Sequence, residues 1–408
     1  MDSVRIRRSR PPAASPTGQR YGFPYLSADE IYLDSACQTL RPQPVIDALT
    51  EYYREYGACG ERTHYAWGRR VDERVTATRD ALVRLLALPP RRYRTSFTLN
   101  TTYGINLLLL QVPVGRYTRI VTSHTEHNSV FVPVMRYAQR AGVPRILLER
   151  DPDGALRSSP ADLERAIVVV SAMNNVDGTV TPGLDQLVAD THRAGGIVIV
   201  DAAQAASHAI SAVRGIPADA ICFSAHKMYG ASLGVIVAAT TLLEELELQF
   251  VGGGQVAAVG EDGVQWRTEL ESRLEPGLQA WGEIIALGAA LDWLDAFERA
   301  TGQSPEAHEH ALAEHLFAGL AEMPHVRLFS PRPSGVLSIV PERVDAHRLA
   351  VFLSKANISV RSGHFCAHHW LRDVAQVPPL VRFSLGAHNT LADVERTLEV
   401  TGRLMKGL

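Results

Sequence analysis

The chain has 408 residues, of which 46% are hydrophobic and 21% charged, and its formal net charge at pH 7 is −3. This size and composition predict a soluble protein with one large domain and a smaller companion. Without an overall positive charge or a long apolar run, neither nucleic acid nor a membrane is an expected partner. Four cysteines without a CxxC pair indicate neither a disulfide framework nor a metal site, so a reducing cytoplasm is the expected location.

Residues 1–20 are basic and rich in proline and serine, but they lack an apolar core. This composition is not that of a secretory signal and favours a disordered basic tail. A transit peptide stays open as an alternative, because arginine and serine with few acidic residues fit that composition too.

From about residue 95 to residue 240, short apolar runs rich in β-forming residues alternate with amphipathic stretches. The runs are RTSFTLN, TRIVTSH, RAIVVVSAM, GIVIVDAA, DAICFSAH and GVIVAAT. Continuous apolar strands that alternate with helices are typical of a mostly parallel sheet covered on both faces. We therefore predict a large α/β domain over residues 21–280.

After about residue 275 the pattern changes. A long helical stretch, GEIIALGAALDWLDAFERA, is followed by the strand-like runs GVLSIV, ISVRS and VRFSLG and by two further helical segments. This order predicts a smaller C-terminal α+β domain over residues 281–408. The N-terminal part of the large domain is a candidate to pack on it.

Polar residues follow most of the predicted strands of the large domain. They are Asn100 to Thr102, His124 to His127, Asn174 and Asn175, Asp201 and Gln204, and Ser224, His226 and Lys227. Open α/β sheets bind ligands beyond the carboxyl ends of their strands, so these residues are the first candidates for a functional site.

Lys227 is one of only three lysines among 41 basic residues, the others being Lys355 and Lys406. A guanidinium keeps its proton, whereas a desolvated ammonium can lose it and form a Schiff base with a carbonyl. The alternative is a structural lysine paired with a carboxylate at a strand end. The residues around Lys227 therefore decide its role.

Asp201 and Lys227 end two strands that follow each other in the chain, 26 residues apart. Pyridoxal phosphate needs this combination, because a lysine binds its aldehyde and an aspartate keeps its ring nitrogen protonated. Thr101 and Thr102 precede an apolar helix and can bind the phosphate through hydroxyl and backbone N–H groups. The alternative role of Thr101 is a plain helix cap.

Further side chains complete the predicted site. Ser224 and His226 are candidate phosphate ligands, His127 is a candidate to stack on the pyridine ring, and Gln204 could donate to its phenolic oxygen. Asn175 and Arg361 could bind a substrate carboxylate. Taken singly, His127 or Gln204 is more often an ordinary polar residue near a turn, and Arg361 carries little weight by itself because arginine is abundant.

Eight motifs occur in the order and spacing of the class V aminotransferase superfamily of fold-type I pyridoxal-phosphate enzymes. They are LDSACQTL, NTTYGINL, EHNSVFVP, NNVDGTVTP, VDAAQAASH, FSAHKMYG, GGGQ and VRSGHFCAH. Over residues 30–400 the chain resembles most closely the cysteine desulfurase and selenocysteine lyase branch. The resemblance implies the fold of the pyridoxal-phosphate-dependent transferases and a homodimer with active sites near the subunit interface.

The resemblance also implies roles for individual residues. Lys227 would form the Schiff base, Asp201 would contact the pyridine nitrogen, and Gln204 would contact the phenolic oxygen. His127 would stack on the ring, and the phosphate would be bound by Thr102, Ser224 and His226. The substrate carboxylate would be bound by Asn175 and Arg361. Cys366 falls where that branch carries the thiolate that receives sulfur as a persulfide. His364, His368 and His369 could supply positive charge near it. The alternative is a buried structural cysteine.

Some positions depart from the family pattern. Leu278 stands where related chains carry a threonine that reaches the partner subunit's phosphate. Cys37 and Gln38 replace small or hydroxyl residues of an entry loop, and His368 to Trp370 alter the segment after Cys366. These changes leave the cofactor residues intact and favour a specialised substrate.

The sequence therefore predicts a pyridoxal-phosphate lyase that cleaves the C–S bond of cysteine or a cysteine derivative through an external aldimine. The sulfur is either taken by Cys366 or expelled by β-elimination, and a sulfur-acceptor protein is a candidate partner. A class V aminotransferase, an epimerase or a β-eliminating C–S lyase acting on a specialised metabolite is the alternative. A non-catalytic sulfur-transfer scaffold is a third hypothesis.

Overall fold

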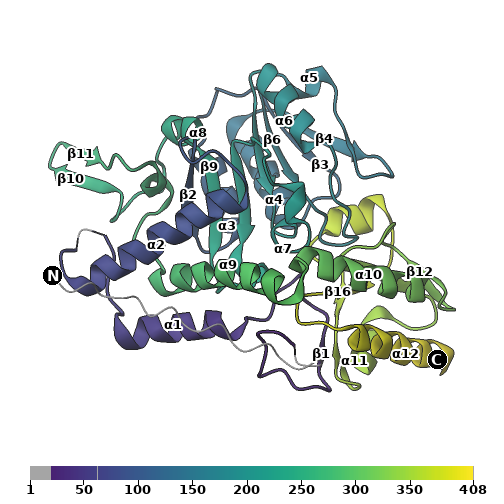
Figure 1. Cartoon of the computed structure of the whole chain (residues 1–408). Coiled ribbons are helices and arrows are strands. Elements are labelled where there is room, and N and C mark those ends of the chain that lie inside the picture. The colour runs from purple at the N-terminus through teal and green to yellow at the C-terminus, as the bar shows by residue number, and fades with distance from the viewer. Residues whose placement is uncertain (1–19, 62, 408) are drawn as a thin grey trace.

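A computed structural model describes residues 20–61 and 63–407 (Figure 1). Its largest element is an eight-stranded sheet with the order β2-β9-β8-β7-β6-β3-β4-β5. The strands are β2 (Tyr93–Thr98), β3 (Arg119–Ser123), β4 (Arg145–Arg150), β5 (Leu156–Arg157), β6 (Ala166–Ser171), β7 (Ile197–Asp201), β8 (Ala220–Ser224) and β9 (Gly234–Ala239). The pairs from β4 to β8 are parallel, whereas β9 runs antiparallel to both β8 and β2. The predicted mostly parallel α/β sheet is confirmed.

The central strands are apolar throughout because helices cover both faces of the sheet. Along β6, Ile167 and Val169 contribute to one buried cluster, and the alternating Val168 and Val170 contribute to another. The first cluster includes α3 (Thr101–Gln111), α4 (Asn128–Ala141) and α8 (Thr240–Glu245). The second includes α6 (Leu184–Arg193) and α7 (Ala205–His208) on the opposite face. Alternate side chains of one strand thus point to opposite faces, as the period of a strand requires.

Three long helices pack together on the second face of the sheet (Figure 1). They are α1 (Gln43–Glu55), α2 (Ala66–Leu85) and α9 (Trp281–Thr301), and α9 contacts both of the others. Gly282 of α9 lies against Tyr52 of α1, and Gly288 lies against Thr78 of α2; a Cβ on either glycine would clash with that neighbour. The helix that opens the predicted small domain therefore shares its core with the large sheet. The division of the chain at residue 280 stays a prediction.

A second sheet is antiparallel, with the order β12-β13-β16-β15. Its strands are β12 (Val326–Leu328), β13 (Val336–Pro341), β15 (Arg361–Gly363) and β16 (Leu380–Ser384). Three helices, α10 (Pro305–Ala321), α11 (Ala346–Ser354) and α12 (Leu391–Gly407), share its apolar core. Near the N-terminus, β1 (Ile31–Tyr32) pairs in parallel with β14 (Ile358–Ser359), so the start of the described chain packs on this second unit.

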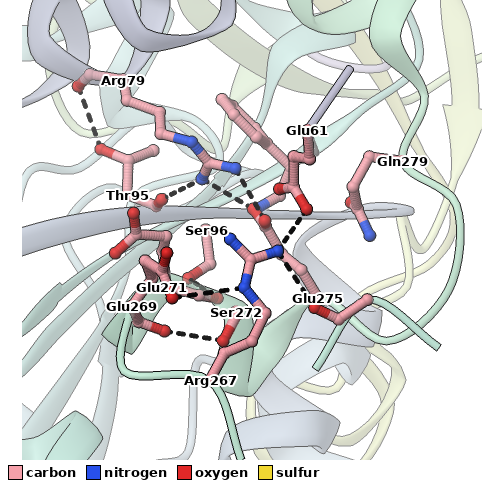
Figure 2. A network of polar contacts seen from close by, with 12 residues as sticks. Glu61, Arg79, Thr95, Ser96, Arg267, Glu269, Glu271, Ser272, Glu275 and Gln279 are labelled. Atoms are coloured by element: carbon pink, nitrogen blue, oxygen red, sulfur yellow. Dashed lines mark hydrogen bonds and ion pairs between the residues drawn. The ribbon is translucent and has the colours of Figure 1, made fainter. Parts of the chain in front are cut away.

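A buried ion pair fixes α2 to the large sheet and to the segment before α9. The Arg79 guanidinium donates to both carboxylate oxygens of Glu275 at 2.7 Å, and the backbone N–H of Phe97 in β2 donates to the same carboxylate at 2.6 Å. Figure 2 shows these contacts beside a second group in which Arg267 pairs with Glu61 and Glu269. Every charged oxygen of Glu275 therefore has a donor.

Other parts of the chain lie outside these two cores. The hairpin β10 (Val256–Gly260) and β11 (Gly263–Trp266) projects from the body of the molecule (Figure 1). A short π-helical turn, His369–Val374, follows the segment of Cys366. Residues 1–19 of the predicted basic tail lie outside the described residues. Within the described ranges, no helix combines the length and apolar character that a membrane crossing requires.

Candidate active site

The carboxyl ends of β6, β7 and β8 and the start of α3 border a cavity of about 260 Å³. All the predicted cofactor-binding residues line it, and so does Asn175; the lining residues are Asn100, Thr101, Thr102, His127, Ser129, Ser171, Met173, Asn175, Asp201, Ala203, Gln204, Ser224, His226 and Lys227. Two predicted residues, Arg361 and Cys366, are not part of the lining. The edge of the sheet thus brings together side chains that lie up to 127 residues apart in the sequence.

Lys227 reaches the cavity from a short 3-10 turn, Ala225–Lys227, that directly follows β8. Burial lowers the pKa of Lys227, the Asp201 carboxylate opposes the shift, and the Arg382 guanidinium reinforces it. A lowered pKa increases the fraction of neutral amine, which is the nucleophilic form. Among the described residues, no carboxylate forms an ion pair with Lys227 within 4 Å, so its amine is not held as a structural cation.

Asp201 ends β7, beside the end of β8, and its side chain is buried. Its carboxylate accepts hydrogen bonds from the N–H of Ala203 at 2.8 Å and from the Ser129 hydroxyl at 3.1 Å. Burial raises the pKa of Asp201, and the hydrogen bond from Ala203, the charge of Lys227 and the Ser129 hydroxyl oppose that rise. The carboxylate therefore has donors on the protein side and an electrostatic partner across the cavity.

His127 caps the start of α4, where its Nδ1 accepts the backbone N–H of Ser129 at 3.0 Å. Burial lowers the pKa of His127 to about 3, and the charge of Lys227 lowers it further. The imidazole is therefore neutral at physiological pH, and the accepted hydrogen bond at Nδ1 places its proton on Nε2. Ser129 contacts both His127 and Asp201, so one hydroxyl positions two of the predicted residues.

The first turn of α3 supplies donors for an anion. The Thr101 N–H donates to Ser224 Oγ at 3.0 Å, and the two hydroxyls lie 2.6 Å apart. The Asn100 side chain accepts the N–H of Tyr103 at 2.9 Å. The first N–H groups of a helix have no intrahelical partner. Among the described contacts, the N–H of Thr102 has no acceptor, so it is available to bind a ligand.

Gln204 and His226 complete the cavity wall. Gln204 Nε2 donates to the Ala36 carbonyl at 2.8 Å, and its buried Oε1 has no partner among the described residues. Burial lowers the pKa of His226 to about 4, with Lys227 and Arg41 acting in the same direction. His226 is therefore a neutral hydrogen-bonding group at physiological pH. An unsatisfied buried oxygen of this kind is expected where a ligand is to bind.

Arg361 and Arg382 both pair with Asp34, but they differ in burial. The Arg361 guanidinium binds Asp34 at 2.9 and 3.0 Å, and its side chain is 47% exposed. Arg382 is 3% exposed and donates to the Asn175 carbonyl at 2.9 Å and to Asp34 at 3.3 Å. Sequence reasoning missed Arg382, although it lies nearer to the cavity wall through Asn175.

Cys366 is exposed and lies in a turn at the rim of the site. Its carbonyl accepts the N–H of Asn128 at 2.7 Å, and the carbonyl of Phe365 accepts from the Asn175 side chain at 2.8 Å. Phe365 and Cys366 both have positive φ angles, 49° and 57°, which side-chain-bearing residues rarely adopt. Burial lowers the pKa of His364, with His368 acting in the same direction. This shift disfavours the positive charge that was expected of His364.

Glu126 lies within the candidate range His124 to His127, but the sequence analysis assigned it no role. This buried side chain accepts from Ser123 Oγ at 2.6 Å and from the Ser171 backbone N–H at 3.0 Å. Burial raises the pKa of Glu126, and the hydrogen bonds from Ser123 and Ser171 oppose the rise. Because Ser171 lines the cavity, Glu126 supports its wall from behind.

A second cavity, of about 410 Å³, lies between α3 and α4. Its lining is mainly apolar, with Arg136 and Arg140 at its edge and with neither a lysine nor a carboxylate. It therefore lacks the nucleophile and the acid–base groups that the smaller cavity contains. The candidate active site is the cavity at the strand ends.

Comparisons with known proteins agree with this geometry. The family model described as aminotransferase class-V matches residues 31–397. A probable cysteine desulfurase of Vibrio cholerae is 31% identical over 90% of this chain and 92% of its own length. Among solved structures, the cysteine desulfurase of Thermococcus onnurineus has a TM-score of 0.83 at 29% identity, covering 93% of this chain and 96% of its own. The Escherichia coli cysteine desulfurase CsdA has a TM-score of 0.83 at 28% identity, covering 95% and 98%.

The matches extend over nearly the whole chain rather than over one motif. They confirm the predicted resemblance, the fold class and the prediction that the protein is an enzyme. The chain belongs to the class-V aminotransferase family.

Proposed function

We propose that this enzyme binds pyridoxal phosphate and cleaves the C–S bond of cysteine or a cysteine derivative. One observation carries the proposal: a single cavity contains Lys227 with a lowered pKa, the buried carboxylate of Asp201 and the start of a helix. The relatives named cysteine desulfurase support the choice of substrate. When bound, pyridoxal phosphate supplies an electron sink for negative charge at the substrate α-carbon.

The residues that are present fit this cofactor. The unpartnered buried oxygen of Gln204 and the N–H of Thr102 are the polar groups expected at a ligand site. Thr101, Thr102, Ser224 and His226 would hold the phosphate, and Lys227 would hold the aldehyde. Asp201 would keep the ring nitrogen protonated, His127 would cover the ring, and Gln204 would contact the phenolic oxygen.

Lys227 is the proposed proton carrier of the reaction. Because burial lowers its pKa, its Nζ can accept a proton from the substrate α-carbon and return one later at neutral pH. Because the pKa of His127 is about 3, its imidazole does not carry a second proton at neutral pH and so has none to donate. His127 therefore contributes a neutral ring face rather than an acid.

The substrate carboxylate has two candidate guanidinium partners. Arg361, predicted from the sequence, is paired with Asp34 at the surface and would have to leave it. Arg382 is buried beside Asn175 and acts on the pKa of Lys227. We propose that Arg382 and Asn175 fix the carboxylate and that Arg361 assists at the entrance. Arg382→Lys should then raise KM more than Arg361→Lys does.

Cys366 is the proposed acceptor of sulfur. Its thiolate would attack the substrate sulfur, so that an S–S bond forms as the Cβ–S bond breaks. Protonation of the remaining three-carbon fragment gives alanine, which leaves, and the enzyme keeps the sulfur as a persulfide on Cys366. This exchange balances without an external oxidant, because the thiol and cysteine together contain all the atoms of the persulfide and alanine.

A second reaction is favoured by the position of Cys366, which is exposed and does not line the cavity. A β-elimination needs no acceptor thiol, and it converts an S-substituted cysteine and water into pyruvate, ammonia and a thiol. The carbon product distinguishes the two reactions: alanine indicates desulfuration and pyruvate indicates elimination.

The test uses the holoenzyme with cysteine and with S-alkyl cysteines, followed by mass spectrometry of the carbon and sulfur products. Cys366→Ala should abolish alanine formation from cysteine if the persulfide route holds. Unchanged alanine formation in this variant would reject that route. Absence of both alanine and pyruvate with every substrate would reject the proposed function as a whole.

We also propose the assembly and setting implied by the family resemblance: a homodimer in the cytoplasm that passes sulfur to an acceptor protein. Exposed apolar side chains support an interface, with Leu278 79%, Val259 67% and Trp67 58% exposed. Light scattering of the purified enzyme tests the dimer, because a mass near 44.6 kDa would identify a monomer.

A further inference from the structure

Cys37 lies in a turn whose neighbouring residues bind two residues of the cavity lining. The carbonyl of Ala36 accepts from Gln204 Nε2 at 2.8 Å, and the N–H of Thr39 donates to the His226 carbonyl at 2.9 Å. Both Gln204 and His226 line the cavity. Cys37 lies between these two anchors in a turn closed by its own N–H, which donates to the Asp34 carbonyl at 3.0 Å.

The turn of Cys366 is anchored to the same cavity through other residues. Asn175, which lines the cavity, holds the carbonyl of Phe365, and Asn128, the neighbour of His127, holds the carbonyl of Cys366. The two thiol-bearing turns therefore lie at the rim of one site. They belong to segments that are more than 300 residues apart in the sequence.

Arg382 connects the two turns directly. Its guanidinium donates to Asp34, where the turn of Cys37 begins, and lies over the ring of Phe365, beside Cys366, at 4.8 Å. Burial lowers the pKa of Lys227, and negative charge on Cys37 or Cys366 opposes that shift.

The other two cysteines are placed differently. Cys222 is buried inside the large sheet, and burial raises its pKa well above the ordinary value of a thiol. Cys59 is exposed, and its thiol contacts the Gly60 carbonyl at 3.1 Å rather than a residue of the cavity. Cys37 and Cys366 are thus the two cysteines whose turns are anchored to residues of the cavity lining.

We propose that Cys37 is a second sulfur carrier, which takes the outer sulfur of the persulfide formed on Cys366. This step rests on the proposed function, because desulfuration must first load Cys366. The Cys37 thiolate attacks the outer sulfur, a new S–S bond forms on Cys37, the S–S bond on Cys366 breaks, and Cys366 leaves as a thiolate. The proton and electron counts balance without an oxidant, since one persulfide is exchanged for another.

This transfer has a direct consequence for catalysis. Cys366 regains its thiolate while the sulfur waits on Cys37, so a second cysteine molecule can react before an acceptor removes the first sulfur atom. The enzyme would then store two sulfane sulfur atoms for each active site.

The test gives the holoenzyme a single equivalent of cysteine with isotopically labelled sulfur, stops the reaction with an alkylating agent, and locates the label on peptides. The label should be found first on Cys366 and then on Cys37. In Cys37→Ser, it should stay on Cys366 about tenfold longer. Cys59→Ser is the matched control and should behave as the wild type.

Label that stays on Cys366 in the wild type and never reaches Cys37 would overturn the transfer. So would a Cys37–Cys366 disulfide released together with one equivalent of hydrosulfide, because that product requires attack on the inner sulfur. If cysteine yields neither label nor alanine, the proposed function fails instead.

A second arm tests the thiols without turnover. The oxidant diamide should join Cys37 to Cys366 in the holoenzyme, detected as one cross-linked peptide that is absent from Cys37→Ser. Failure of this cross-link would overturn the inference even if desulfuration itself is observed.

Discussion

Two polar clusters of this enzyme are buried to a similar degree but are completed in opposite ways. Around Arg79 and Glu275, the carboxylate oxygens have donors from both a guanidinium and the backbone of β2 (Figure 2). In the cavity, Lys227 lacks a close carboxylate among the described residues, and Gln204 Oε1 has no partner. A closed polar network thus stabilises the fold, whereas an open one leaves polar groups for a ligand.

The largest effect is expected at Lys227. Lys227→Arg keeps a basic side chain but removes the amine that would bind the aldehyde, so C–S cleavage should fall by about 10⁴-fold. The visible absorption band of the bound cofactor should disappear. Activity within tenfold of the wild type would contradict this role.

Glu275→Gln should produce the largest loss of stability. It leaves the guanidinium of Arg79 buried without a counter-charge, which costs about 3–4 kcal/mol in the free energy of unfolding. Urea unfolding measures this loss. Asp190→Asn, which breaks an exposed ion pair with Arg193, is the control and should change the free energy by less than about 0.5 kcal/mol.

Asp201→Asn tests the comparison directly. The variant should lower kcat about 100-fold, because the ring nitrogen loses its charged partner. Its free energy of unfolding should not fall, since burial already disfavours the charged carboxylate and raises its pKa. A loss of stability as large as that of Glu275→Gln would show that the two clusters do not differ in kind.

The smallest predicted effect is the pH dependence contributed by His127. Its pKa is lowered to about 3, so the unfolded chain binds a proton at pH 5 that the folded chain does not. Stability must therefore fall as the pH drops below 6.5, by on the order of 1–2 kcal/mol between pH 7 and pH 5. His127→Gln should flatten this fall in urea unfolding, whereas His310→Gln at an exposed ion pair should leave it unchanged.

Much of the site could be predicted because its residues follow strands in the sequence. Asp201 and Ser224 end β7 and β8, so the local pattern alone places them at one edge of the sheet. Arg382 could not be found in this way, since it lies within β16 and approaches the site through Asn175, 207 residues away in the sequence. The abundance of arginine also removed any signal of its own, and the family resemblance pointed to Arg361 instead.

The fold shows the same limit of local patterns. The periodicity of residues 281–301 predicts a helix, and the structure contains it as α9. What periodicity does not specify is the partner of a helix, and α9 buries its apolar side against α1 and α2 rather than with the second sheet. The roles of Glu126 and Ser129 were missed for a similar reason, because they depend on Ser171 and Asp201 in other strands.

The position of α9 also affects how the protein is made. Helices α1 and α2 leave the ribosome early, but α9, which packs on both of them, is encoded only at residues 281–301. Until that segment is synthesised, the apolar surfaces that α9 covers on both helices remain open to water and to chaperones. The large unit therefore completes its folding late in translation, and its long-range contacts favour slow folding. Chains truncated before Thr301 should be targets for proteolysis.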